Sequence, residues 1–391
     1  MYPACLDQGL PVKRIALGLM VVSVMGWGCS SGTAGSSDAG PSDAGPVDAG
    51  PVDAGQVTDA GPQCVPTVPP SPTSGASPAD GTGSVTFAIS KLYLGDTDPD
   101  GTSDKLNGWK QFGYNIDGLC SSASSTDLCK PADNASHANV YPDGNGGIDN
   151  AFGEFILPII LSVASDASAR VNQSIAGGDA TVLFEMQKLG TSTDYTPLNV
   201  SVFNGGDLGA VPRFDGTDAW PVLSSSLNDG ATLASGAKIS GPNGYLAGDT
   251  WVSGDLGPMP LTLYPFGGGV RLILPIDHAV ITLQLDATHQ HGTKGVISGV
   301  MDTQLFLSGF RETMGRIDPT LCSGPTVDSI STQIVQGSDI LDDGTQDPTK
   351  VCDSISVGIG FDAYPVQLGA VQQPPTPLPS PCPDAGSDGG A

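Results

Sequence analysis

The acidic residues of this chain are almost all aspartates. Of its 41 acidic residues only three are glutamates, Glu154, Glu185 and Glu312, and the other 38 are aspartates. Asp favours turns because its short side chain bonds to nearby backbone, whereas Glu is a good helix former. The chain also contains 54 Gly and 33 Pro. This composition predicts strands joined by turns, and it supplies the oxygen-rich loops that Ca²⁺ requires.

The charge of the chain limits its partners. Its 41 acidic and 15 basic residues give a formal net charge of −26. Such a surface repels phosphate backbones, so we expect no nucleic-acid partner. With 391 residues and 39% apolar content, the chain can still bury a core once its low-complexity ends are set aside.

The N-terminus has the pattern of an export signal over residues 1–28. Lys13 and Arg14 precede an uncharged run of 14 residues, Ile15 to Gly28. This length suits the apolar region of a signal peptide and is too short to span a bilayer. The chain is therefore expected to be exported.

The end of this run resembles a bacterial lipobox. The segment is Met25-Gly26-Trp27-Gly28-Cys29, and it departs from the usual pattern at Gly26, where an apolar residue is common. The resemblance implies cleavage before Cys29 and lipidation of Cys29. With Ser30 next, it also implies a lipid anchor in the outer membrane or at the cell surface. The alternative is an ordinary secretory signal with a cysteine close to its cleavage site.

Low-complexity segments flank the middle of the chain. Residues 30–63 repeat Asp-Ala-Gly-Pro with few apolar side chains, so no burial offsets the entropy lost on ordering. We therefore expect residues 29–79 to carry the lipid anchor and a disordered stalk. A Pro-rich stretch and a shorter repeat predict a disordered tail over residues 372–391.

Residues 80–371 read as a β-rich domain. Apolar side chains alternate with others from Val85 to Tyr93 and from Val182 to Gln187, as in strands with one buried face. Residues 261–286 predict two or three further strands, with residues 295–307 pairing beside them. Asn243-Gly244 is typical of a hairpin turn.

Helices are expected only at residues 166–176 and 327–341. The sequence therefore predicts a mainly β fold, an antiparallel β-sandwich of jelly-roll or lectin-like form with one or two packed helices. A division into two β-domains near Ser192 or Asn228 stays open.

Six cysteines remain after Cys5 in the signal and Cys29 at the anchor: Cys64, Cys120, Cys129, Cys322, Cys352 and Cys382. An even number in an exported protein predicts three disulfides, although the sequence does not fix their pairing. Proximity favours Cys120 with Cys129 and Cys322 with Cys352, which leaves Cys64 with Cys382. Zinc is a weaker alternative because no Cys-x-x-Cys occurs.

A first candidate Ca²⁺ site follows the first strand. Residues 96–104 have the spacing of an EF-hand-type loop with a glycine at Gly101. The expected ligands are Asp96, Asp98, Asp100, Thr102 and Asp104. Asn107 replaces the usual bidentate Glu, so the site would be weak or completed by a distant residue. The alternative is an acidic turn that binds no metal.

A second candidate Ca²⁺ site comprises Asp117, Asp143, Asn145 and Asp149. These residues lie in two Gly-rich segments. We expect them to converge if the loop between Cys120 and Cys129 folds back. The alternative is a pair of hydrogen-bonded Asx turns.

One resemblance covers much of the domain. The run from Trp109 through Asn115-Ile116-Asp117-Gly118 to Asp149-Asn150-Ala151-Phe152-Gly153 resembles uncharacterised myxobacterial surface lipoproteins. It extends to the region of Cys322 and Cys352 and to residues 355–361. The resemblance implies secretion and a shared fold, and it supplies no activity.

Signatures of catalysis are poor, and no catalytic residue is assigned. The sequence contains no Gly-x-Ser-x-Gly, His-Glu-x-x-His or phosphate-binding loop. We therefore expect a Ca²⁺-stabilised binding or structural module whose partner is a glycan or another envelope protein. The alternative is a secreted, glycan-active hydrolase that uses an Asp pair such as Asp117 and Asp149.

Two other groups of side chains are open to functional interpretations. His289 and His291 would lie on one face of an extended segment and could bind a transition metal, or simply occupy a hairpin tip. Three tryptophans could stack on a sugar, or fill the core: Trp109, Trp220 and Trp251.

Overall fold

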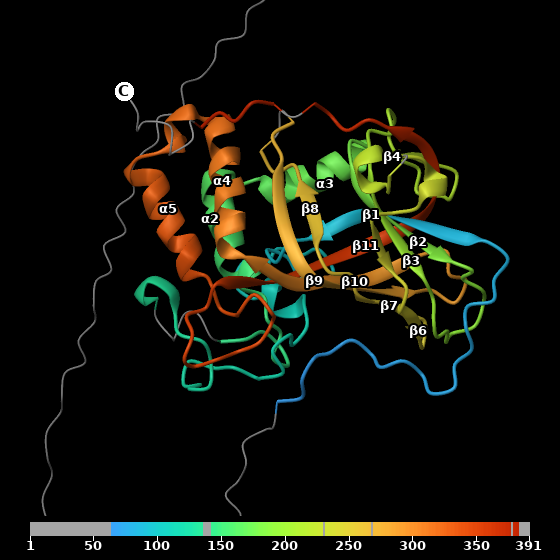
Figure 1. The fold of residues 1–391 in the computed structure, drawn as a ribbon, viewed down its shortest axis with the longest axis horizontal. Helices are drawn as coiled ribbons and strands as arrows, with labels where there is room; N and C mark the ends of the chain where they lie inside the picture. The colour runs from blue at the N-terminus through green and yellow to red at the C-terminus, as the bar shows by residue number, and fades with distance from the viewer. Residues whose placement is uncertain (1–63, 136–141, 230, 267–268, 377, 383–391) are drawn as a thin grey trace, which may run out of the picture. The chain divides into compact units, whose positions relative to one another are not determined.

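The computed structural model describes residues 64–135, 142–229, 231–266, 269–376 and 378–382 (Figure 1). The expected signal peptide, Cys29, the stalk repeats up to Gln63 and the repeat after Cys382 lie outside the described residues. The described residues belong to one compact unit, so no domain boundary falls near Ser192 or Asn228.

The fold is mainly β, as the sequence predicts, and its strands form one mixed sheet of 11 strands. The strands are β1 (Ser84–Tyr93), β2 (Thr181–Gln187), β3 (Val200–Gly205), β4 (Ala219–Leu223), β5 (Ile239–Gly241), β6 (Tyr245–Ala247), β7 (Thr250–Asp255), β8 (Met259–Leu263), β9 (Leu272–Leu285), β10 (Gly292–Asp302) and β11 (Ser354–Gln372). Neighbouring strands are antiparallel except for the parallel pair β11 and β4.

The long strand β11 organises the sheet. It pairs with β10 through its first half, with β1 from Gly360 to Val366, and with β4 from Gln367 to Gln372. Since β1, β2, β3 and β4 are also neighbours in that order, these four strands and β11 form a closed ring. The sheet buries a large core cluster and a smaller one around Trp220 and Phe203, as expected for a sandwich-like fold with two apolar faces.

The turn between β6 and β7 differs from the expected hairpin. Gly248 and Asp249 connect these strands and both have positive φ, of 55° and 61°. Such a turn matches the twist of the flanking strands. The sequence Asn243-Gly244 instead separates β5 from β6, which pair with different strands.

Four α-helices occur among the described residues, two more than expected: α2 (Leu157–Val163), α3 (Ala167–Gly177), α4 (Thr303–Ile317) and α5 (Pro325–Gln336). The helix predicted at 166–176 is α3. The one predicted at 327–341 is α5, which begins two residues earlier and ends at Gln336. Helices α4 and α5 lie side by side at one end of the sheet, and α3 packs against β1 (Figure 1).

Helix α4 was not expected, because residues 295–307 read as one strand. Strand β10 ends at Asp302, whose carboxylate accepts a hydrogen bond from the backbone N–H of Leu305 at 2.6 Å. This is a helix N-cap, and it converts strand into helix at Thr303. Phe306, Phe310 and Met314 then face the core at helical spacing.

Helix length gives one further finding. Within the described ranges no single helix is long and apolar enough to cross a membrane, and only the pair Phe152–Val163 and Ala167–Gly177, bent by 86°, meets such a criterion together.

Both expected tails pack on the domain for part of their length. The backbone of Thr67 donates to the carbonyl of Gly146 and accepts from Asn115. At the other end, the Arg316 guanidinium donates to the carbonyls of Leu378 and Pro379 at 3.1 and 3.2 Å. The ordered part of the chain therefore exceeds the predicted limits of 80 and 371.

All six expected cysteines form disulfides, but the predicted pairing is wrong. The observed bonds are Cys64–Cys120, Cys129–Cys352 and Cys322–Cys382. The bond between Cys129 and Cys352 joins residues 223 positions apart. Sequence proximity failed because the fold brings Lys130 beside Val351 as a β-bridge, which places distant cysteines together.

Candidate functional site

Five carboxylates gather beside the disulfide between Cys129 and Cys352, and we call them the carboxylate cluster: Asp117, Asp143, Asp149, Glu154 and Asp339. Four of them line a cavity of about 10 Å³ together with Trp109 and Asn150. The fifth member, Asp117, lies close enough for its charge to raise the pKa values of Asp143, Asp149 and Asp339. A cavity of this size holds one water molecule or one ion.

Asp149 is the most deeply buried member, with only 4% of its surface exposed. Its Oδ2 accepts hydrogen bonds from the backbone N–H groups of Ile116 at 2.6 Å and Asp117 at 3.3 Å. Asp143 is held similarly, because its carboxylate accepts the backbone N–H of Ser121. The two Gly-rich segments therefore converge, as the sequence predicts, and backbone N–H groups in and just after the first segment donate to both carboxylates of the second.

Asp339 and Glu154 were not expected in the site. Asp339 follows helix α5, and a bridge between Ile340 and Ser354 holds it beside β11. Its carboxylate accepts the N–H of Ser356 at 2.8 Å and the Ser356 hydroxyl at 2.5 Å. Glu154 projects from a π-helical turn, Phe152–Ile156, a distortion that is frequent at functional sites.

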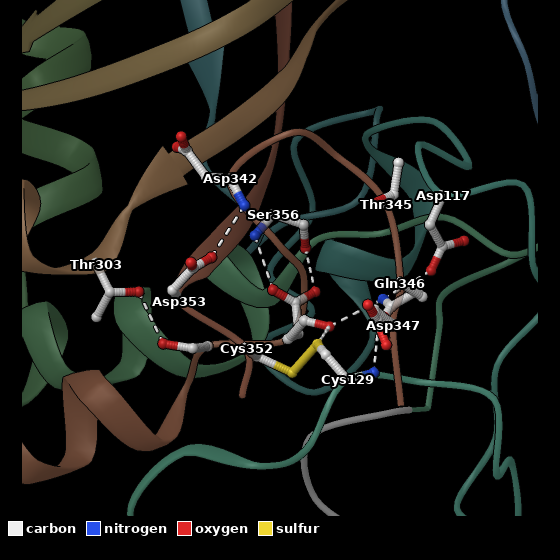
Figure 2. Close-up of a disulfide and its surroundings, with 12 residues drawn as sticks. Asp117, Cys129, Thr303, Asp342, Thr345, Gln346, Asp347, Cys352, Asp353 and Ser356 are labelled. Atoms are coloured by element: carbon white, nitrogen blue, oxygen red, sulfur yellow. Dashed lines mark hydrogen bonds between the residues drawn. A yellow bond between two sulfur atoms is a disulfide. The ribbon is translucent and has the colours of Figure 1, made fainter. Parts of the chain in front are cut away.

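Gln346 connects the cluster to the disulfide (Figure 2). Its side-chain amide donates to the Asp117 carboxylate at 2.9 Å and to the Asp339 carbonyl at 3.0 Å. Its carbonyl oxygen accepts the backbone N–H of Cys129 at 2.9 Å. Three separate segments of the chain are thus fixed relative to one another by one side chain.

Asn150 holds together the backbone segments around the cavity. It is 2% exposed, and its amide donates to the carbonyls of Trp109 and Phe112, each at 3.0 Å. Its oxygen accepts from the N–H groups of Gly153 and Gly358 at 3.0 and 2.9 Å. Because all its polar groups are used, Asn150 has a structural role and no capacity left for a ligand.

Burial and mutual repulsion hold protons on this cluster. Burial, then the charges of neighbouring carboxylates, raises the pKa of Asp149 well above its usual value. Burial is also the largest cause of the raised pKa values of the other members. It raises the pKa of Asp143 and of Asp339 to about 7, and the pKa of Glu154 to about 8. Burial raises the pKa of Asp117 as well. At neutral pH the cluster therefore retains protons that free carboxylic acids would lose.

The cavity lining contains no Lys, Arg or His. Charged carboxylates in such a place require a proton or a cation. Two further oxygen atoms on the neighbouring loops, Asn115 Oδ1 and Ser121 Oγ, are buried without a hydrogen-bond partner. In the part of the chain that is described, however, no group of three or more His, Cys, Asp or Glu is arranged to hold a metal ion. A cation would therefore have to draw these side chains closer together.

The first predicted Ca²⁺ loop is closed by its own hydrogen bonds. The carboxylate of Asp98 accepts the N–H groups of Asp100 and Thr102 at 3.1 and 2.7 Å. That of Asp104 accepts the N–H of Asn107 at 3.1 Å, and the backbone N–H of Asp104 donates to the Asp96 carbonyl at 2.9 Å. These contacts are typical of an Asx turn.

Of the residues predicted for the second Ca²⁺ site, Asn145 is exposed and does not line the cavity.

A groove of about 570 Å³ lies beside this loop. Its lining includes Asp100 from the loop, the stacked rings of Tyr93 and Phe112, and Lys294 from β10. Lys294 has a φ of 52° within a bulge of β10, and such bulges redirect side chains. The groove thus combines aromatic walls with groups that donate and accept hydrogen bonds.

The three candidate tryptophans and the two candidate histidines have structural roles. Trp109, Trp220 and Trp251 are at most 4% exposed, so none of these three offers a ring to a sugar. His289 is also buried, and its two ring nitrogens lie 2.7 Å from the Gly190 carbonyl and 3.1 Å from Asp249. His291 stacks on Tyr364, with ring centroids 4.2 Å apart.

Comparison with models of protein families, with curated proteins and with solved structures found no match. The class of protein is therefore defined by fold and site alone. It is a mainly β, sandwich-like protein with three disulfides and a partly buried cluster of carboxylates.

Proposed function

We propose that this protein is a non-catalytic binding module, exported and displayed at the cell surface through a lipid on Cys29, and that its carboxylate cluster holds Ca²⁺. The lipobox resemblance and the repeats up to Gln63 support the anchor and the stalk. Three disulfides fit an oxidising compartment outside the cytoplasm.

The observation that carries the Ca²⁺ proposal is the lining of the 10 Å³ cavity, which contains four carboxylates and no Lys, Arg or His. Ca²⁺ prefers oxygen ligands and tolerates irregular geometry. Asp149 and its neighbours would supply those oxygens, and the cation would remove the repulsion that raises their pKa values. The ion would tie together the two Gly-rich segments, the π-helical turn and the segment after α5.

The ligand of the module would occupy the groove beside the Asp98 loop. A glycan is favoured because Asp100 and Lys294, both in the lining of the groove, can exchange hydrogen bonds with hydroxyl groups. An envelope protein is the other partner that the sequence leaves open.

A hydrolase that uses Asp117 and Asp149 is less well supported. A glycosidase needs two carboxylates on either side of a sugar ring. The cavity beside Asp149 admits a single water or ion, and both carboxylates already accept backbone hydrogen bonds.

Terbium luminescence tests the Ca²⁺ proposal, because Trp109 lines the cavity and can transfer excitation energy to bound Tb³⁺. We expect Tb³⁺ emission on excitation at the tryptophan band, loss of this emission when Ca²⁺ is added, and a lower melting temperature in EDTA. Asp149→Asn should weaken the emission, since the amide keeps the backbone hydrogen bonds and removes the charge. The matched control is Asp229→Asn, at an exposed position.

Two results would count against the proposal. One is an unchanged melting temperature in EDTA together with no tryptophan-sensitised emission. The other is equal emission from the Asp149 and Asp229 variants, which would place the ion elsewhere. The anchor is tested separately: Cys29→Ser in the full-length precursor should move the protein from the membrane fraction to the soluble one.

A further inference from the structure

Two adjoining cavities of about 400 and 130 Å³ lie between strands β2 and β3 on one side and β8 on the other. Both are lined by Val182, Asn204, Ser225 and Leu261, so they share a wall, and we call the two cavities together the β8 slot. None of these residues belongs to the carboxylate cluster or to the groove beside the Asp98 loop.

The walls of the β8 slot are mainly apolar. In β3, Val202 and Asn204 share one face because side chains alternate along a strand, and Val182 lies directly opposite Asn204 in β2. Met259 and Leu261 of β8 are buried and form the facing wall. A concave apolar space with a few polar groups is the usual form of a small-molecule site.

The edge of β8 argues against a peptide ligand. Among the described strands β8 pairs only with β9, and residues Pro258 to Leu261 line the slot. Pro258 and Pro260 line the slot there, and proline has no N–H to donate to an added strand. The prolines therefore disfavour a ligand that would add a strand to this edge.

The charge of the slot is opposite to that of the protein. The chain has 41 acidic and 15 basic residues, yet no Asp or Glu lines either cavity. The charged residues of the lining are Lys238 and Arg271, both cations. This pattern complements an anionic ligand.

Lys238 is placed to hold such an anion. Its ammonium donates to the carbonyl of Ser225 at 2.7 Å, and Ser225 lines both cavities. A lysine ammonium has further N–H donors, so one such contact leaves it able to bind a carboxylate. The contact fixes the cation beside the apolar walls.

We propose that the β8 slot binds a single-chain amphiphile with an anionic head, namely a free fatty acid. Its carboxylate lies at Lys238, and its chain packs along Val182, Val202 and Leu261. The proposal is independent of Ca²⁺ binding by the carboxylate cluster, and different residues carry it.

Displacement of a fluorescent fatty acid from the full exported domain tests this proposal. The competitors are dodecanoate and 1-dodecanol, which share a chain length and differ in the charge of the head. We expect dodecanoate to compete about tenfold better than dodecanol, as one charged hydrogen bond can supply. Lys238→Ala should remove this preference and leave dodecanol unchanged.

Two more variants complete the test. Asn204→Trp places a large ring in the slot from a partly exposed strand position and should abolish binding of both competitors. Lys105→Ala removes an exposed lysine outside the slot and should bind like the unmodified protein. The proposal is overturned if the fluorescent probe does not bind, if dodecanol competes as well as dodecanoate, or if Asn204→Trp binds normally while its melting temperature shows a folded protein.

Discussion

The carboxylate of Asp339 accepts both the backbone N–H and the hydroxyl of Ser356, at 2.8 and 2.5 Å. The same hydroxyl accepts the N–H of Ala151 at 2.8 Å. One serine on β11 thus joins the segment after α5 to the start of the π-helical turn, and both ends of this link reach the carboxylate cluster.

Replacing this serine should destabilise the fold. In Ser356→Ala the Asp339 carboxylate loses a donor and the buried N–H of Ala151 loses its acceptor, at a cost of about 1–3 kcal/mol. Urea unfolding at pH 6 measures the change. Ser354→Ala is the matched control, because the Ser354 hydroxyl is equally buried in β11 but has no hydrogen-bond partner. A loss of stability as large in Ser354→Ala would contradict this explanation.

The pKa values of the cluster predict how stability depends on pH. Its carboxylic acids bind protons more tightly in the folded protein than in the unfolded chain, where their pKa is about 4. In EDTA, the contribution of the cluster to stability should therefore be complete below about pH 4 and should be lost progressively as the pH rises toward 8. The expected fall is at least about 1 kcal/mol, or roughly 2–4 °C in melting temperature.

Two further measurements isolate the cluster as the source of this pH effect. Asp339→Asn should flatten the profile, because its amide keeps an acceptor for Ser356 and does not titrate. Added Ca²⁺ should restore stability mainly at the upper end of the pH range. A melting temperature that rises from pH 5 to pH 8 in EDTA would be incompatible with proton retention by the cluster.

The disulfide between Cys129 and Cys352 should influence the same pH profile. Replacing both cysteines by serine is expected to cost about 2–5 kcal/mol. It should also alter the pH dependence, because the backbone N–H of Cys129 is held by Gln346, which contacts Asp117. The comparison is the double serine variant at Cys322 and Cys382, which lie away from the cluster. That variant should lose stability with an unchanged pH profile.

Replacing either of two glycines by alanine should change the stability of the protein, and in opposite directions. A Cβ at Gly358 would overlap the carbonyl of Phe112 and approach the Asn150 side chain. Gly358→Ala should therefore cost about 1–3 kcal/mol by overpacking. Gly309 lies inside α4 with free space around its Cα, so Gly309→Ala should stabilise the protein by up to about 1 kcal/mol. Thermal unfolding of the two variants measures both effects, and shifts of the same sign would contradict the assignment.

Much of the sheet could be predicted from local patterns. The alternation at Val85, Phe87 and Ile89 reports one buried face of a strand, and that signal is local. Helix α4 was missed although Phe306, Phe310 and Met314 have helical spacing, because the β10 alternation runs into it without a Gly or Pro break. The cap at Asp302 was the available signal.

The site could be predicted only in part. Asp117, Asp143 and Asp149 lie in two loops close in the sequence, and they were expected to meet. Asp339 joins them through the bridge between Ile340 and Ser354, which depends on the whole sheet. Glu154 had one local signal, since a charged residue interrupts the apolar run from Phe152 to Ile156. Disulfide pairing failed for the same reason as Asp339, because long-range topology decides it.

The three disulfides also determine how the protein would carry mechanical tension. A pull on Cys64 passes through Cys120 to Cys129 and crosses to Cys352. It then reaches Cys382 directly or through Cys322. Strands β1 to β10 lie outside this covalent path, whereas β11 lies on it between Cys352 and Cys382. Tension between the two ends would therefore load the hydrogen bonds that β11 makes with β1, β4 and β10, and it would leave the pairs among the other strands unloaded.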